Sequence, residues 1–145
     1  MSDIPIIELD DFRKPRIAVL CLSGLESFLG DIVTYLEKNY VVRTCYSRDM
    51  SEIESAVSWC DLCWIEWANQ LAVEVTQKMP ILAEKQVLVR LHSYEALSNF
   101  CPQINWTVVD SLLFVAEHIR NIVLQQLPKL PEIVSISVVP NGVEV

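Results

Sequence analysis

One stretch of the chain combines an acidic side chain with two indoles at the end of an apolar run. Glu66 stands between Trp64 and Trp67 in the sequence Trp-Ile-Glu-Trp-Ala-Asn. A carboxylate is costly to bury beside aromatic rings unless it is paired. Glu66 could therefore hold a sugar hydroxyl, with Trp67 stacked on a sugar face. The alternative is a rim glutamate that bonds to the N-terminus of the next helix, and the sequence leaves both interpretations open.

A second such stretch is centred on His92, which follows Val-Arg-Leu and precedes Ser-Tyr-Glu. An imidazole at the end of a strand can donate to or accept from a ligand near neutral pH. The alternative is that His92 and Ser93 only cap the following helix. Arg90 lies inside the apolar run and needs a partner for its charge. Glu66 or Glu95 could supply that partner.

The glycines and cysteines do not form a recognisable nucleotide, redox or metal motif. Gly24 follows the first apolar run and could let the backbone approach a phosphate, but an ordinary turn is the simpler interpretation. A dinucleotide fingerprint needs three spaced glycines, which are lacking here, so NAD binding is disfavoured.

Cys60-Asp-Leu-Cys63 precedes a strand instead of opening a helix, so it is interpreted as structural and not as a redox motif. A zinc site would need further ligands, and His92 and His118 are isolated.

These residues can act together only if the fold brings the ends of its strands to one edge. From residue 16 onward, short apolar runs alternate with amphipathic stretches. Alternation of this kind predicts an α/β protein with a Rossmann-like, open, mainly parallel sheet of about six strands and helices on both faces. Ligands of such sheets collect at the carboxyl ends of the strands. Strands are expected at 17–22, 40–45, 62–67, 86–91, 111–115 and 133–139, and helices at 27–38, 51–59, 70–79, 93–100 and 117–127, with Ser51 and Glu54 as a capping box and Asn69 as a further N-cap.

Composition sets further bounds. Residues 1–15 are expected to be an extended leader, and residues 16–145 a single domain. The net charge of -8 and pI near 4.7 argue against nucleic-acid binding, although a local basic patch could still allow peripheral membrane contact. Mean hydropathy is +0.32, yet no apolar run has the length of a membrane span. The five cysteines, with no secretory signal in the N-terminal sequence, favour reduced thiols in the cytoplasm.

Several segments, in this order along the chain, resemble the N-terminal half of a family 4 glycosyltransferase with the GT-B fold. The resemblance covers roughly residues 16–145, and its most specific part is Pro-Asn-Gly-Val-Glu at 140–144, where the family has aspartate in place of Glu144. Ser23-Gly24 resembles the family's Gly-Gly loop with its first glycine replaced. The other matching segments are Glu66-Trp67, Val-Leu-Val-Arg-Leu-His-Ser-Tyr-Glu at 87–95, Ile-Asn-Trp at 104–106 with Val109-Asp110, and Leu-Phe-Val-Ala-Glu-His-Ile-Arg at 113–120.

The resemblance implies the acceptor-binding N-terminal domain of a retaining glycosyltransferase. Such an enzyme transfers a sugar from a nucleotide sugar to a glycan, lipid or other acceptor, without a metal or other cofactor. The nucleotide sugar is held by a C-terminal Rossmann domain outside these 145 residues, so this chain alone is expected to be inactive. By position, His92 matches the histidine that approaches the donor sugar, as the catalytic residue. The expected substrate-binding residues are Gly24 near the diphosphate, Glu66, Glu95 and Arg120 on the acceptor side, and Trp67, Asn69 and Asn141.

An alternative from another class is a non-catalytic α/β binding or protein-interaction module that shares only the fold, because a fold does not fix a function. Whether the protein is an enzyme, which acceptor and donor it takes, and its oligomeric state are left open by the sequence.

Overall fold

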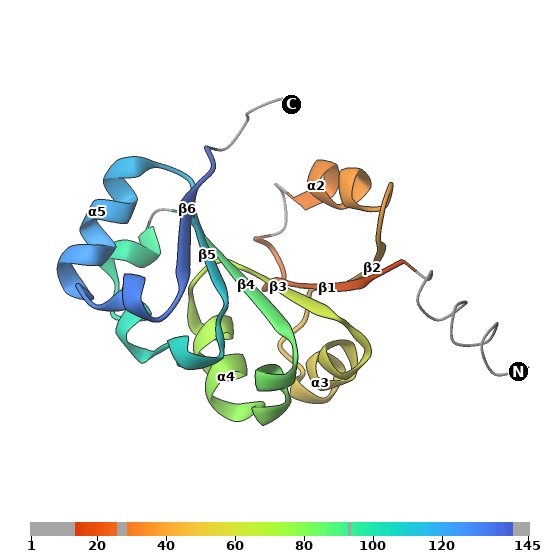
Figure 1. Ribbon diagram of the computed structural model, residues 1–145. Coiled ribbons are helices and arrows are strands. Elements are labelled where there is room, and N and C mark those ends of the chain that lie inside the picture. The colour runs from red at the N-terminus through yellow and green to blue at the C-terminus, as the bar shows by residue number, and fades with distance from the viewer. Residues whose placement is uncertain (1–13, 26–28, 93, 141–145) are drawn as a thin grey trace, which may run out of the picture.

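The apolar runs form one open sheet in which all strands point the same way, and this confirms the expected α/β class (Figure 1). A computed structural model describes residues 14–25, 29–92 and 94–140. The strands pair in parallel in the order β2-β1-β3-β4-β5-β6. Their bounds are β1 (Arg16–Leu20), β2 (Val41–Cys45), β3 (Leu62–Glu66), β4 (Gln86–Leu91), β5 (Ser111–Phe114) and β6 (Ser135–Val138).

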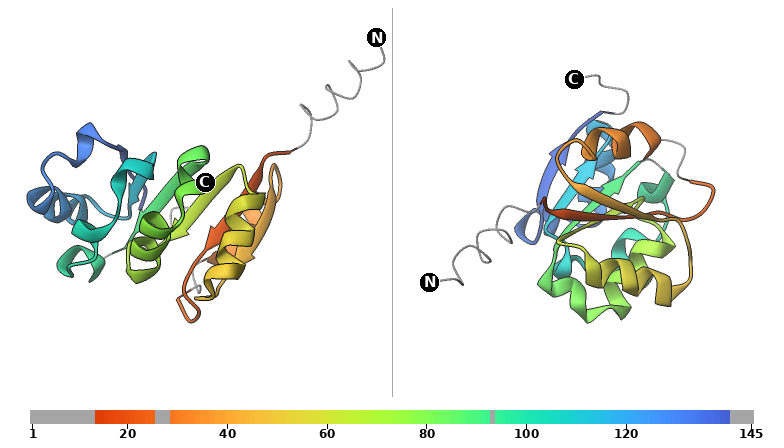
Figure 2. Two further views of the ribbon diagram at one scale, coloured as in Figure 1. Left: turned by 90° about the horizontal axis from the view of Figure 1, so that it is seen from below. Right: turned by 90° about the vertical axis from the view of Figure 1, so that its right-hand side faces the viewer.

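Four α-helices in the described part of the chain cover the two faces of the sheet unequally. Side chains alternate between faces along a strand, so Ile17 and Val19 of β1 point to one face and Ala18 and Leu20 to the other. The first face packs against α2 (Leu29–Leu36), and the second contributes to the large core with α3 (Met50–Trp59), α4 (Gln70–Lys78) and α5 (Glu117–Gln126). The right-hand view in Figure 2 shows α2 on one side of the sheet and α3 and α4 on the other. None of these helices is long and apolar enough to cross a membrane.

The helix starts confirm one expected cap and correct another. Asn69 caps α4 as predicted, since its side chain accepts a hydrogen bond from the amide of Leu71. The predicted capping box of Ser51 and Glu54 is wrong. Helix α3 begins one residue earlier, and its N-cap is Asp49, whose carboxylate accepts from both the amide and the hydroxyl of Ser51. These bonds also lower the pKa of Asp49, because they favour its charged form.

Several predicted elements are shorter than expected. Strand β3 stops at Glu66 because Trp67 adopts a positive φ of 78°. Strand β6 starts at Ser135, because a 3-10 turn over Leu130–Glu132 and the turn and bend at residues 133 and 134 precede it. The predicted helix at 93–100 is a 3-10 turn over Tyr94–Leu97 followed by bends. The start of the helix predicted at 27–38 lies outside the described residues, and its remaining part ends early, at residue 36.

The strand order fixes where the topology changes direction. After β1 the chain forms β2 on one side of it, and β3 then pairs with β1 on the other side. The loops that leave the carboxyl ends of β1 and β3 therefore diverge, and this switch point is where open α/β sheets bind their ligands. The segments at this point are 22–25 and 67–69, next to the end of β4.

Candidate functional site

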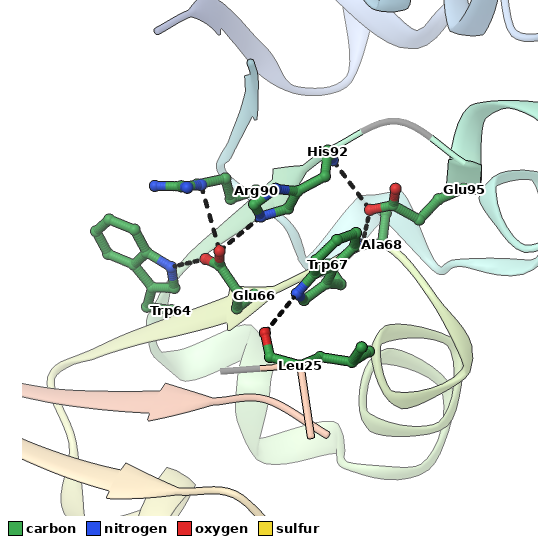
Figure 3. Close-up of polar contacts among 8 residues, drawn as sticks. All are labelled: Leu25, Trp64, Glu66, Trp67, Ala68, Arg90, His92 and Glu95. Carbon is green, nitrogen blue, oxygen red and sulfur yellow. Dashed lines mark hydrogen bonds and ion pairs between the residues drawn. The ribbon is translucent and has the colours of Figure 1, made fainter. Parts of the chain in front are cut away.

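Glu66 is the centre of a buried ion cluster at the carboxyl end of β3 (Figure 3). It is fully buried, and the parallel register places it directly opposite Arg90 of β4. One oxygen, Oε2, lies 3.4 Å from Nε of Arg90, and Oε1 accepts a 2.8 Å hydrogen bond from the indole of Trp64. Arg90 thus has the carboxylate partner that its place in an apolar strand requires.

His92 completes this cluster from the end of β4. Its Nε2 lies 2.6 Å from Oε2 of Glu66, and in the tautomer with its hydrogen on Nε2 the ring donates to this carboxylate. The imidazole is only 3% exposed and stacks on the indole of Trp67, with 3.9 Å between ring centroids and 19° between planes. The imidazole is therefore held at Nε2 by Glu66 and on one face by the indole of Trp67. A contact of His92 with a sugar stays a prediction.

Trp67 has a strained backbone that its contacts enforce. Its φ of 78° is unfavourable for any residue with a Cβ, at about 1–3 kcal/mol. Its amide donates to the carbonyl of Arg90 (2.8 Å), and its indole Nε1 donates to the carbonyl of Leu25 (3.1 Å). Trp67 therefore connects the loop after β1 with the ends of β3 and β4. Strain of this kind persists where the surroundings over-determine it and is concentrated at functional sites.

Glu95 is the second buried carboxylate of the site. It is fully buried, and its Oε2 accepts from the amides of Ala68 (3.1 Å) and His92 (3.0 Å). These two amides belong to the segments that leave β3 and β4. Glu95 therefore joins the loop after β3 to the loop after β4. Both Glu66 and Glu95 make their hydrogen bonds to groups of the protein itself. Direct contact of either carboxylate with a ligand stays a prediction.

The other predicted site residues lie around this cluster or apart from it. Asn69 is buried, and within the described part of the chain its amide nitrogen has no hydrogen-bond acceptor. Gly24 adopts a φ of +94°, which its turn requires and other residues rarely adopt. Arg120 lies on α5, where its guanidinium pairs with Glu117 at 2.6 Å. Asn141 lies outside the described residues.

Three members of the cluster were not among the predicted site residues. For Arg90 the sequence predicts only that it needs a partner, Trp64 is noted only as an aromatic neighbour of Glu66, and Leu25 has no predicted role. Trp64 could have been found, because a residue two positions before Glu66 in a strand shares its face. The carbonyl of Leu25 has no sequence signal, since any residue type offers the same acceptor.

Both cysteines of the motif Cys60-Asp-Leu-Cys63 lie in the protein interior. Cys60 lies at the end of α3, Cys63 lies in β3, and both are fully buried. The hydrogen bond between the two thiols lowers the pKa of Cys60 and raises that of Cys63. Burial raises the pKa of a further thiol, Cys101, to about 12. Among the described residues, no group of three or more His, Cys, Asp or Glu side chains could hold a metal ion.

All five cysteines are free and buried, so a thiol reagent should not reach them in the folded protein. We expect no rapid reaction with Ellman's reagent at mildly alkaline pH, and reaction of all five thiols in denaturant. The control is the same assay after the folded protein has been treated with a reductant and the reductant has been removed, which should change neither result. Fast reaction of any thiol in the folded protein would show that at least one of these cysteines is accessible.

Fold and site together define an α/β protein with a Rossmann-like parallel sheet and a buried, charged cluster at its switch point. The cluster joins side chains from the ends of β3 and β4 to the loop after β1. No protein-family model, no curated protein and no solved structure matches the chain.

Proposed function

We propose that this chain is the acceptor-binding N-terminal domain of a retaining glycosyltransferase, which transfers a sugar from a nucleotide sugar to a glycan or other acceptor. In this arrangement a second domain, outside the chain, holds the nucleotide. The carboxyl edge of the sheet then forms one wall of the cleft between the domains.

The observation that carries the proposal is the joining of Glu66, Trp67, Arg90, His92 and Glu95 at one edge. They come from two of the segments on which the resemblance rests, and the fold unites them at the switch point. A core needs neither two buried carboxylates nor a strained tryptophan for its stability. Their place at the edge where such sheets bind ligands supports a function for them there.

The cluster also limits what the domain can bind by itself. The loop after β1 has a single glycine in its turn, and its carbonyl at Leu25 is tied to Trp67. A loop held in this way leaves little freedom for the close backbone approach that a diphosphate needs. We therefore expect a saccharide, and not a nucleotide sugar, to bind the isolated chain.

Indole N–H resonances provide the test, because the chain has four tryptophans and Trp67 reports on the switch point. Neutral oligosaccharides of glucose, mannose, galactose and N-acetylglucosamine are titrated separately into nitrogen-labelled protein. At least one should shift the Trp67 signal, with a dissociation constant on the order of 1 mM, or about 4 kcal/mol. The internal control is Trp106, whose indole is bonded to the carbonyl of Cys101 just before β5 and should not respond.

Two results would contradict the proposal. In the first, no saccharide moves the Trp67 signal. In the second, UDP-glucose or GDP-mannose moves it at micromolar concentration, which would place the donor on this domain. Trp→Phe variants assign each indole signal beforehand.

A further inference from the structure

A polar groove lies at the end of the edge strand β2, next to α3. Its volume is about 450 Å³. One wall consists of residues 43–47, from β2 and the loop that follows it, and the other consists of Ser51, Glu52 and Ser55 from α3. Residues 46, 47 and 51 follow the end of β2. The groove therefore reaches the same carboxyl edge as the buried cluster of Glu66, Trp67, Arg90, His92 and Glu95, which we call the Trp67 cluster.

The side chains of the groove favour an uncharged ligand that carries hydroxyl groups. Its charged groups are one guanidinium, Arg43, and one carboxylate, Glu52. The thiol of Cys45 stays neutral, because burial and then the nearby Glu52 raise its pKa. The remaining polar lining is mainly hydroxyl groups, each of which can donate and accept.

A free anion is a poor fit for the same groove. The N-terminus of α3 already has its negative partner, since Asp49 accepts from the amide and hydroxyl of Ser51. Glu52 adds a second negative charge in the first turn. The guanidinium of Arg43 is held by Ser55, whose oxygen lies 3.1 Å from Nη2, and lies 5.9 Å from the ring centroid of Trp59. Arg43 is therefore positioned as a hydrogen-bond donor in a groove with no net charge.

The position of the groove relates it to the site at the switch point. Only β1 lies between β2 and β3, and neighbouring strands are about 4.8 Å apart, so the groove lies roughly 10 Å or more from the Trp67 cluster. We infer that the groove is a distal subsite for the acceptor, and that the acceptor is a neutral oligosaccharide chain long enough to reach both places. This inference rests on the proposed function, and it makes chain length a determinant of affinity.

The test measures affinity against saccharide length. The sugar series that moves the Trp67 signal is titrated from monosaccharide to pentasaccharide into the wild-type chain, Arg43→Ala and Arg48→Ala. The Arg48 variant is the matched control: it removes the same charge five residues further along, in the loop after β2, at an exposed residue that does not line the groove. The wild type and the control should gain about tenfold in affinity with length, and Arg43→Ala should lose that gain while its monosaccharide affinity is unchanged.

The amide signals of Ser51 and Ser55 report on binding in the groove, and the Trp67 indole signal reports on binding at the switch point. Together they separate a failure of the inference from a failure of the proposed function. If saccharides move Trp67 without any gain with length, or Arg43→Ala keeps the gain, the inference falls and the proposed function stands. If inorganic phosphate moves the groove signals and saccharides do not, the groove is an anion site and the inference is again wrong. If no saccharide moves Trp67, the proposed function is wrong, whatever the groove signals do.

Discussion

Replacing Glu66 with alanine is expected to lower the free energy of unfolding by about 3–5 kcal/mol. The change removes the carboxylate that accepts from Trp64 and His92 and pairs with Arg90. The guanidinium, whose side chain is only 12% exposed, would then lose this carboxylate partner. Urea denaturation measures the loss, and an unchanged denaturant slope would show that the unfolded states are comparable.

An exposed glutamate provides the control for the Glu66 variant. Glu84 lies in the 3-10 turn before β4, and Glu84→Ala should change stability by less than about 0.5 kcal/mol. A second variant, Glu66→Gln, keeps the shape of the side chain and one oxygen that can accept a hydrogen bond. Its loss of stability should lie between the losses of Glu66→Ala and Glu84→Ala. A loss below about 1 kcal/mol in Glu66→Ala would show that the cluster does not hold the ends of β3 and β4 together.

The pairing of Glu66 with Arg90 shows what the sequence could predict about this site. An arginine inside an apolar strand must find a carboxylate because its desolvation is costly, and this argument needs no knowledge of the fold. It left two candidates, Glu66 and Glu95. The choice depends on the register between β3 and β4, which places residue 66 opposite residue 90. Register is a property of the assembled sheet, so the sequence alone could not decide.

The same limit applies to Trp67. Its apolar neighbours predicted one more residue of strand, and nothing in a tryptophan indicates a positive φ. The conformation is imposed by contacts with other segments, namely the stacking on His92 and the hydrogen bond to the loop after β1.

The start of α3 also depends on contacts, because Asp49 and Ser51 are both good N-caps and the sequence does not choose between them. The sheet itself was predictable because each apolar run carries its own signal, whereas these details arise from contacts between runs.

The predicted role of His92 can be separated from its structural role by choosing the replacement. His92→Ala should lose about 2–4 kcal/mol of stability, because it removes a hydrogen bond to a buried charge and a ring stack. His92→Gln can still donate to Glu66 through its side-chain amide. It should therefore lose only the stacking, about 1 kcal/mol, and remain folded. Urea denaturation of both variants measures these losses, and equal losses would show that the bond to Glu66 contributes little.

The glutamine variant then tests the proposed catalytic role in the two-domain enzyme that the proposal requires. If the imidazole bonds the donor sugar mainly in the transition state, His92→Gln should lower kcat roughly a hundredfold, equivalent to about 2–3 kcal/mol, with little change in KM. A purely structural role predicts an unchanged kcat in this folded variant, because the ends of β3 and β4 are still joined through Glu95 and Trp67. Full activity of His92→Gln would therefore remove His92 from the catalytic residues and leave it as a structural link between Glu66 and Trp67.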